Sequence, residues 1–406
     1  MTNTTYKQTA IGLIPSNWEV KKIKEIGDVS SGGTPDTTKV RYWNGDINWC
    51  TPTDITALKN KFLGNTKTKI TEEGLKSSSA KILPPFSIIV CTRATIGKAA
   101  INTVPMSTNQ GFKNIIPRNI DTDFLYYKIL SEEKGLMKIA NGSTFLEVSK
   151  TDFDNFHIAV PPLPEQQKIA SILSTWDVAI DNCKNIIEKI SYRNNGVTQQ
   201  LLSGKMRVKG FDEKWKVKVI NECLNFAPRP ILKPTENYLA LGLRSHGKGI
   251  FHKNDFDPAT IAMETMYEVK ENDLIINITF AWEHAVAIVS KKDEGGLVSH
   301  RFPTYTFNSQ NATPDFFRHF VLQKYFKFLL ELISPGGAGR NRVMSKTDFL
   351  KLEIKLPSVA EQKAIATILD KATLELNQYQ QKLQTLQLQK KGLMQQLLTG
   401  KVRVKI

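Results

Sequence analysis

Glycine-bearing loops with interleaved basic and amide residues are the part of this sequence best suited to chemistry. In the first half they read SSGGTP (30–35), TRATIGK (92–98), STNQGFK (107–113) and GSTFLEVSK (142–150). Glycine lets a backbone approach a phosphate closely. Arginine and lysine neutralise phosphates or read guanine, and asparagine and glutamine have the amide geometry that reads adenine. The candidate contact residues are Gly32, Gly33, Thr34, Thr92, Arg93, Lys98, Asn109, Gln110, Lys113, Ser143 and Thr144.

The second half offers loops of the same kind, which read LRSHGKG (243–249), SHRF (299–302) and PGGAGRNRVMSK (335–346). Its segment ITFAWEHA (278–285) corresponds roughly to TRATIGK, so the loops differ between the halves. Each loop alone could be an ordinary solvated turn, and their recurrence in two halves favours binding. The candidates are Arg244, His246, Lys248, Arg301, Arg340, Asn341 and Arg342, of which the GRNR stretch is the strongest.

Motifs for catalysis or metal binding are missing from the sequence. It contains no NPPY or DPPY tetrapeptide, no P-loop, no GxSxG and no HExxH. The six histidines show no metal-ligand spacing, and the four cysteines form no zinc or disulfide pattern. Asp255 and Asp257 lack the further carboxylate of a two-metal nuclease. We therefore expect no catalytic residue, no metal site and no cofactor bound by this chain.

Charge points to a polyanionic partner. The net charge is +16 with a pI near 9.5, which favours nucleic acid, although a merely basic protein remains an alternative. Residues 1–164 carry 20 basic and 15 acidic side chains, and residues 206–360 carry 22 and 17, so the excess is shared by both halves. The start of the chain lacks the features of a signal peptide and no long apolar run occurs, so we expect a cytoplasmic protein.

The elements that must position these loops are revealed by an internal repeat. Residues 150–210 and 346–406 align without a gap at an offset of 196, with 22 of 61 positions identical. GLIPSNWEVKKI (12–23) likewise resembles GFDEKWKVKVI (210–220). The chain thus begins with the segment that follows its first helix. This order predicts domain, helix, domain, helix, closed into a pseudo-twofold ring with Met1 near Ile406.

The expected fold is mixed α/β, because short apolar runs such as FSIIVC (86–91) and DLIINITF (273–280) alternate with turn residues. VPPLP (160–164) is interpreted as a boundary that a long helix follows rather than contains. The predicted parts are a first domain at 1–160, a spacer helix at 161–205, a second domain at 206–357 and a C-terminal spacer helix at 358–406.

Both predicted helices carry a heptad ladder, the spacing of a coiled-coil seam. The first comprises Ile180, Cys183, Ile187, Ile190, Asn194, Val197 and Leu201, and the second Leu376, Tyr379, Leu383, Leu386, Lys390, Leu393 and Leu397. The single polar rung falls at the same step in both. It either fixes the register from inside the seam or faces solvent, and the pattern leaves both options open.

Several segments of the sequence resemble those of a known family. The segments GLIPSNWEVKKI, SSGGTP, TRATIGK, STNQGF, VSKTDF and PPLPEQQKIASIL…QQLLSGK, and the second set SKTDF…LPSVAEQKAIATIL…QQLLTGK, resemble the specificity subunit of type I restriction-modification enzymes. The resemblance spans essentially the whole chain, and the duplicated EQ-x2-IA-x-IL helix start is its most specific part. TRxTIGK and NQGF have no clean counterpart in the second half, so its base-reading residues are less well defined.

The resemblance implies two target-recognition domains separated by two similar helices that pack as an antiparallel coiled coil. Each domain would read one half of a bipartite site in double-stranded DNA. The subunit would be non-catalytic and would recruit two modification subunits, which bind S-adenosylmethionine and methylate adenine at N6, and restriction subunits, which use ATP and Mg²⁺. The implied modification-subunit interface comprises Glu165, Gln166, Ile169, Ile172, Leu173, Glu361, Gln362, Ile365, Ile368 and Leu369.

Three alternatives remain open from the sequence. The first is a coiled-coil DNA-binding scaffold without a modification partner. The second is a self-sufficient DNA methyltransferase or nuclease, which the missing motifs oppose. The third is a coiled-coil scaffold that binds no nucleic acid, which the evenly shared positive charge opposes.

Overall fold

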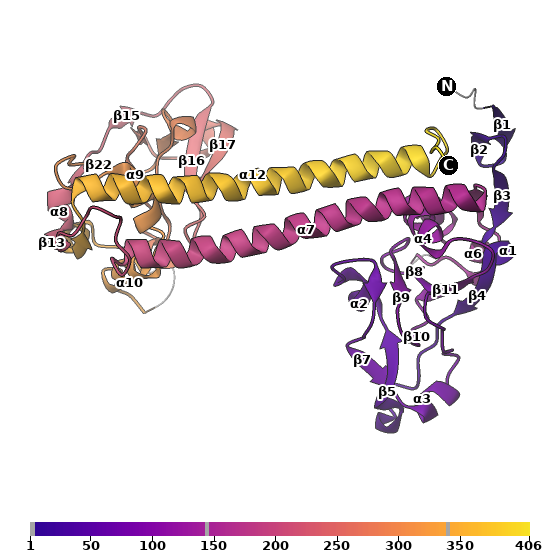
Figure 1. Cartoon of the computed structure of the whole chain (residues 1–406). Coiled ribbons are helices and arrows are strands. Elements are labelled where there is room, and N and C mark those ends of the chain that lie inside the picture. The colour runs from indigo at the N-terminus through magenta and orange to yellow at the C-terminus, as the bar shows by residue number, and fades with distance from the viewer. Residues whose placement is uncertain (1–4, 143–145, 338–341) are drawn as a thin grey trace. The chain divides into compact units, whose positions relative to one another are not determined.

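The computed structural model describes residues 5–142, 146–337 and 342–406, and its chain divides into two compact units (Figure 1). The first unit comprises residues 1–186 and 379–406, and the second comprises residues 187–378. Each unit therefore contains one α/β domain and a segment of each of two long helices, α7 (Leu163–Leu202) and α12 (Val359–Leu397).

The domain of the first unit is built on a five-stranded sheet in the order β4-β11-β8-β9-β6 and a three-stranded sheet in the order β10-β5-β7. Every residue of β8 is buried, as expected for the apolar run at its position. The elements are β1 (Tyr6–Thr9), β2 (Gly12–Pro15), β3 (Glu19–Lys22), α1 (Ile23–Ile26), β4 (Gly27–Ser31), η1 (Val40–Tyr42), β5 (Trp43–Cys50), α2 (Pro52–Thr56), β6 (Phe62–Leu63), β7 (Thr68–Ile70), α3 (Glu72–Lys76), β8 (Ile88–Cys91), β9 (Ala99–Asn102), β10 (Ser107–Thr108), β11 (Phe112–Pro117), α4 (Thr122–Ser131), α5 (Glu133–Ile139), α6 (Lys150–Asp154) and β12 (His157–Val160).

The domain of the second unit repeats this plan. Its four-stranded sheet has the order β14-β22-β19-β20, and its larger sheet has the order β15-β18-β21-β16-β17. The elements are β13 (Lys216–Val219), α8 (Ile220–Cys223), β14 (Leu224–Phe226), β15 (Pro230–Leu232), β16 (Tyr238–Leu243), β17 (Ile250–Phe256), η2 (Pro258–Thr260), β18 (Thr265–Glu268), β19 (Leu274–Ile276), η3 (Ala281–Glu283), β20 (Val286–Ile288), η4 (Lys291–Asp293), β21 (Leu297–Val298), β22 (Thr304–Phe307), α9 (Pro314–Phe320), α10 (Lys324–Leu332), α11 (Lys346–Lys351) and β23 (Glu353–Leu356).

Equivalent strand pairs show that the two domains are copies. Antiparallel β3 and β12 of the first unit match β13 and β23 of the second. The parallel pair β5 and β10 matches the parallel pair β16 and β21. The predicted fold class, a mixed α/β protein with two repeated domains and two long helices, is confirmed.

The boundary of α7 differs slightly from the prediction. The helix begins at Leu163, so it contains Pro164 in its first turn instead of following the proline-rich segment. Proline is tolerated there because the first turn of a helix has no intrahelical acceptor for its missing N–H.

In the first unit the two helix segments run antiparallel. Asp177 of α7 is paired with Lys390 of α12, and the Cys183 thiol lies 3.6 Å from the Tyr379 carbonyl oxygen. The residue number thus rises along one segment while its partner's falls. Ile180 and Cys183 are buried, and the ladder residues Leu383 and Leu386 are half-buried, as a seam requires.

The second unit contains the same antiparallel packing. The Arg193 guanidinium forms an ion pair of 2.5 Å with Glu375, and Asn194 Nδ2 donates to the Ala372 carbonyl at 2.7 Å. The polar rung is therefore bonded across the seam in both units, by Asn194 in one and by Lys390 in the other. This favours a role in register over a solvent-facing position.

The end of the chain returns to the first unit. Tyr6 donates a hydrogen bond of 3.0 Å to the Gly400 carbonyl, so the two ends of the described chain meet there. Met1 itself lies outside the described residues. Across the described ranges, no helix is both long and apolar enough to cross a membrane.

Candidate nucleic-acid interface

The predicted loops of the first unit converge at one place. The Gly32 N–H donates to the Phe112 carbonyl at 3.3 Å, and the Gly33 N–H donates to the Thr108 carbonyl at 2.9 Å. The Thr34 hydroxyl contacts the Gln110 side chain. The segments SSGGTP and STNQGFK, which lie far apart in sequence, are therefore joined.

The two glycines of SSGGTP make this junction possible. A methyl group on Gly32 would lie 1.9 Å from the Asn109 carbonyl oxygen, and one on Gly33 would lie 2.3 Å from the Ala80 nitrogen. Both glycines are buried. Their absent side chains therefore serve packing between loops, whereas the sequence had suggested a close approach to phosphate.

TRATIGK joins the same cluster through Thr92. Its N–H and hydroxyl both donate to the Gly111 carbonyl, at 2.8 and 3.1 Å, and its own carbonyl accepts from the Val148 N–H at 3.0 Å. Thr92 is buried, so it links the loops from the inside. This bond brings the fourth predicted loop, GSTFLEVSK, to the site, although Ser143 and Thr144 lie outside the described residues.

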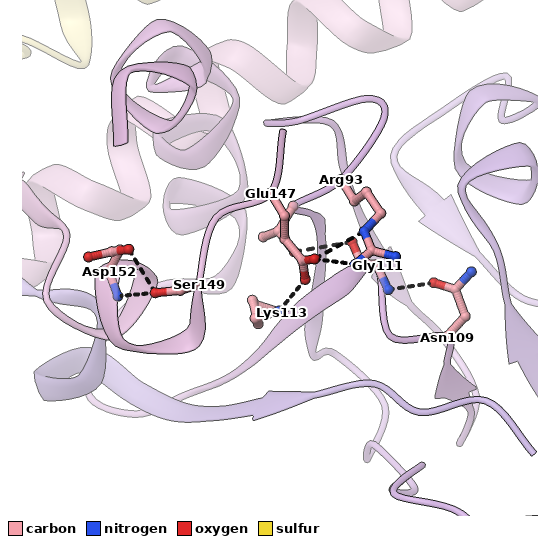
Figure 2. A network of polar contacts seen from close by, with 8 residues as sticks. Arg93, Asn109, Gly111, Lys113, Glu147, Ser149 and Asp152 are labelled. Carbon is pink, nitrogen blue, oxygen red and sulfur yellow. Dashed lines mark hydrogen bonds and ion pairs between the residues drawn. The ribbon is translucent and has the colours of Figure 1, made fainter. Parts of the chain in front are cut away.

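Arg93, Lys113 and Glu147 form a charged network at the centre of these loops (Figure 2). Arg93 donates to Glu147 Oε2 through Nε at 3.0 Å and also through Nη2, while Lys113 Nζ lies 3.4 Å from Oε1. Burial raises the pKa of Glu147, but the hydrogen bond from Arg93 and the charge of Lys113 outweigh it and hold that pKa below its usual value. The carboxylate stays ionised between two cations.

Some of the predicted contact residues of the first unit are exposed and others are buried. The Arg93 side chain is 42% exposed and that of Lys113 only 5%, so the lysine charge is used inside the protein. Lys98 and Gln110 are exposed. Asn109 accepts from the Gly111 N–H at 2.9 Å through Oδ1, and among the described residues no hydrogen bond engages its amide nitrogen (Figure 2).

A capped helix follows the loop cluster in each unit. In the first, the Ser149 hydroxyl accepts from the Asp152 N–H at 3.1 Å, at the start of α6 (Figure 2). In the second, the Ser345 hydroxyl accepts from the Asp348 N–H at 3.2 Å, at the start of α11. The duplicated SKTDF sequence is therefore an N-cap that anchors the end of the loop.

The loops of the second unit meet through equivalent backbone bonds. The Ile278 N–H donates to the Arg301 carbonyl at 3.0 Å, and the Met344 N–H donates to the Ile278 carbonyl at 2.8 Å. These repeat the two bonds that Thr92 makes in the first unit. ITFAWEHA thus occupies the place of TRATIGK, and SHRF occupies the place of NQGF.

Side chains at this second cluster differ from those of the first. Arg301 donates from Nη1 to the Thr279 hydroxyl at 2.9 Å, and the Arg342 guanidinium lies 5.1 Å from the centre of the Trp282 ring. Arg342 also donates to the Ser334 carbonyl at 3.1 Å, so part of its fork is used within the chain. The residues Arg244, His246, Lys248 and Arg301 are exposed, while Arg340 and Asn341 lie outside the described residues.

The glutamate of each EQ motif lies in a buried socket. Glu165 accepts from Trp18 Nε1 at 3.1 Å and from Arg403 at 2.7 and 2.8 Å. Glu361 accepts from Trp215 Nε1 at 3.2 Å and from Arg207 at 2.7 Å through two nitrogens. Each socket is thus completed by the segment that follows the other long helix.

The glutamine of each EQ motif ties the helix to its domain. Gln166 accepts from the Asp121 N–H at 2.8 Å, where α4 begins, and donates to the Pro161 carbonyl at 2.8 Å. Gln362 accepts from the Thr313 N–H at 3.0 Å, where α9 begins. The motif therefore joins the long helix to the equivalent short helix in both domains.

These contacts bear on the predicted modification-subunit interface. Two of its ten residues are accessible: Ile172 is half-buried and Ile368 is 38% exposed. A buried side chain has no surface to offer a partner unless the chain rearranges. The interface prediction remains untested, and the residues whose contacts are internal are Glu165, Gln166, Ile169, Leu173, Glu361, Gln362, Ile365 and Leu369.

Sequence reasoning missed several residues that build the site. Glu147 stands inside a predicted loop but was not selected, because its partner Arg93 is 54 positions away. Arg207 and Arg403 were also missed, although the RVK sequence that both repeats share is a signal that could have identified them. Within the described ranges, no group of three or more histidine, cysteine or acidic residues is placed to hold a metal ion.

Most of the chain matches a known family, as its architecture and sequence suggested. The model of the type I restriction modification DNA specificity domain matches residues 15–192 and again 212–388. The chain belongs to this family, which confirms the resemblance seen in the sequence.

Two relatives of this chain are specificity subunits of type I restriction enzymes. The chain is 42% identical over 194 residues to the type I restriction enzyme MjaIX specificity subunit of Methanocaldococcus jannaschii, an alignment that covers 46% of this chain and 45% of that protein. The chain thus spans about half the length of this relative. The MjaVIII specificity subunit of the same organism is 24% identical over 413 residues, covering 97% of this chain and 94% of that protein.

A solved structure shares the fold over nearly the whole length. The S subunit of a type I restriction-modification system from M. genitalium superimposes with a TM-score of 0.55 at 15% identity, covering 96% of this chain and 97% of that one. The likeness supports the two-domain, two-helix architecture.

Proposed function

We propose that this chain is the non-catalytic DNA-specificity subunit of a type I restriction-modification complex. The observation that carries the proposal is the convergence of the glycine-bearing, basic loops in each of two copied domains, in a chain that belongs to the specificity-domain family. Each unit would read one half of a bipartite duplex site. The different side chains at the two clusters would make the half-sites different in sequence.

The charge of the chain supports duplex DNA as the ligand. Both halves carry an excess of basic residues, and exposed cations such as Lys98 and Arg244 stand at the loop clusters. Phosphate neutralisation would supply salt-dependent affinity, and the base edges would supply specificity.

The proposed protein partners are two modification subunits and, in a restriction-competent complex, restriction subunits. The twofold repetition of domain, helix and socket supports two equivalent places for a modification subunit. S-adenosylmethionine, ATP and Mg²⁺ would be bound by those partners. Because the substrate is DNA, we propose that the complex works in the cytoplasm.

Enrichment from a random duplex library tests this function. The chain, purified with its modification subunit, should enrich two short fixed sequences separated by a gap of constant length. Binding should weaken steeply as salt rises. Enrichment of one undivided motif, or of none while the chain remains folded, would contradict the proposal.

A further inference from the structure

The charged network of Arg93, Lys113 and Glu147 is not needed to build the fold. Equivalent backbone bonds place Thr279, Pro303 and Val343 at the same three positions of the second unit. That unit forms the same joint between its loops without any of these charges. The three charges of the first unit therefore have a role other than joining its loops.

Glu147 fixes how Arg93 is presented. The carboxylate holds the guanidinium along its Nε and Nη2 side, and the backbones of the two residues also form a β-bridge. Within the described part of the chain, no hydrogen bond engages Arg93 Nη1. The outer edge of the fork, Nη1 with the second proton of Nη2, is thus left for a ligand.

The backbone next to Arg93 is also constrained. Ala94 has a φ of 62°, a left-handed conformation that costs a residue with a side chain free energy and persists only where the surrounding structure holds it. The Thr95 N–H donates to the Arg93 carbonyl at 2.7 Å and closes this turn. Arginine and turn together form a preorganised donor.

Guanine fits this donor better than phosphate does. The Glu147 carboxylate cancels part of the positive charge that would attract a phosphate, whereas the O6 and N7 acceptors of guanine belong to a neutral base and depend on the geometry of the donors. The free edge of the fork offers two parallel N–H groups, which is the bidentate geometry that reads guanine in the major groove. Buried Lys113 offsets the second oxygen of the carboxylate and needs no contact with DNA.

We propose that Arg93 reads a guanine in the half-site bound by the first unit and that Glu147 is the positioning residue that orients it. The inference rests on the proposed function and adds the base and the side chains that recognise it. Glu147 does not contact the base. It acts through Arg93.

A base-by-base substitution tests the proposal. The chain in complex with its modification subunit is titrated with duplexes of its enriched site in which single guanines are replaced by 7-deazaguanine, which keeps the base pair and removes the N7 acceptor. At one guanine the unaltered chain should lose about five- to tenfold in affinity. Arg93→Ala should bind the natural site more weakly and should lose nothing further at that guanine.

The positioning role has its own readout. Glu147→Gln should bind nonspecific DNA at least as tightly as the unaltered chain, because it loses a negative charge, while its discrimination at the same guanine falls several-fold because the arginine is no longer held. Arg118→Ala is the matched control, since Arg118 forms an ion pair of 2.6 Å with Asp28 in the same unit. This variant should retain the full response to 7-deazaguanine.

Three results would overturn the inference. An unaltered chain indifferent to 7-deazaguanine at every position has no such contact. An Arg93→Ala variant weakened equally on all sequences, with a salt slope lower by about one, would make Arg93 a phosphate contact. Full discrimination by Glu147→Gln would remove the positioning role. Failure of the proposed function is distinct, because the unaltered chain would then show no sequence preference.

Discussion

Glu165 and Arg403 stand 238 positions apart, yet they form a two-nitrogen ion pair whose carboxylate is fully buried. Glu361 and Arg207 form the same pair in the second unit. The two arginines occupy the same position of the repeat, and each follows the helix opposite the one whose start it caps. The order of elements predicted from the repeat is thus realised in two specific contacts.

Removal of one arginine should destabilise one unit. Arg403→Ala leaves Glu165 buried with Trp18 as its remaining donor, and breaking a buried pair from one side costs about 3–5 kcal/mol. Denaturant unfolding should show an early transition for the first unit, whereas Arg207→Ala should do the same for the second. Lys401→Ala, an exposed neighbour, is the control. An Arg403→Ala variant that unfolds like the unaltered chain would contradict a stabilising role for the pair of Glu165 and Arg403.

Charges in the seam should separate the helices. Leu383→Asp with Leu386→Asp places two carboxylates against the α7 segment, which should lower the helical signal and the midpoint of thermal unfolding measured by circular dichroism. Leu388→Asp is the matched control, because Leu388 is 70% exposed and lies off the seam. An equal response from both variants would contradict the packing described here.

Gly32→Ala should disable the loop cluster of the first unit. The new methyl group would meet the Asn109 carbonyl oxygen at 1.9 Å, so SSGGTP and STNQGFK have to move apart. DNA binding should weaken at least tenfold while the helical signal remains near that of the unaltered chain. Gly392→Ala, where a methyl group meets nothing within 4 Å, should leave DNA binding intact.

The two glycines inside the long helices should be replaceable with a gain. A methyl group on Gly196 or Gly392 meets open space, and alanine is favoured over glycine in a helix by about 1 kcal/mol. Each substitution should raise the denaturation midpoint of the isolated chain. A lowered midpoint would contradict the open space around Gly196 and Gly392.

The Glu147 network should weaken in acid. Its pKa is held below the usual value in the folded chain, so its stabilisation is present above the unfolded pKa of about 4.3 and is lost as pH falls through the lower folded value. The difference in melting temperature between the unaltered chain and Glu147→Gln should be constant from pH 7 to 5 and should shrink below pH 4. A difference that stays undiminished as the pH falls below the unfolded pKa would contradict this.

The repeat and its heptad spacing were enough to predict the long helices, their antiparallel packing and the copied domains. The loops around Thr92 and Gly32 were selected from the sequence as separate binding candidates, and their contacts with one another emerge only in the structure. The partners of Glu147 and Glu165 could not be predicted, since those pairs form only when strands or helices distant in sequence come together. Polar residues of a motif were interpreted as surface, although Glu165 and Gln166 are interior, where each of their side-chain oxygen and nitrogen atoms has a hydrogen-bond partner.

The most direct test of the central claim is the N6-methyladenine map of a genome in cells that express the modification subunit with and without this chain. We expect the chain to add one bipartite motif, with two fixed half-sites and a constant gap. Absence of any added motif, with both subunits expressed and bound to each other, would contradict the claim that this chain directs methylation to a sequence.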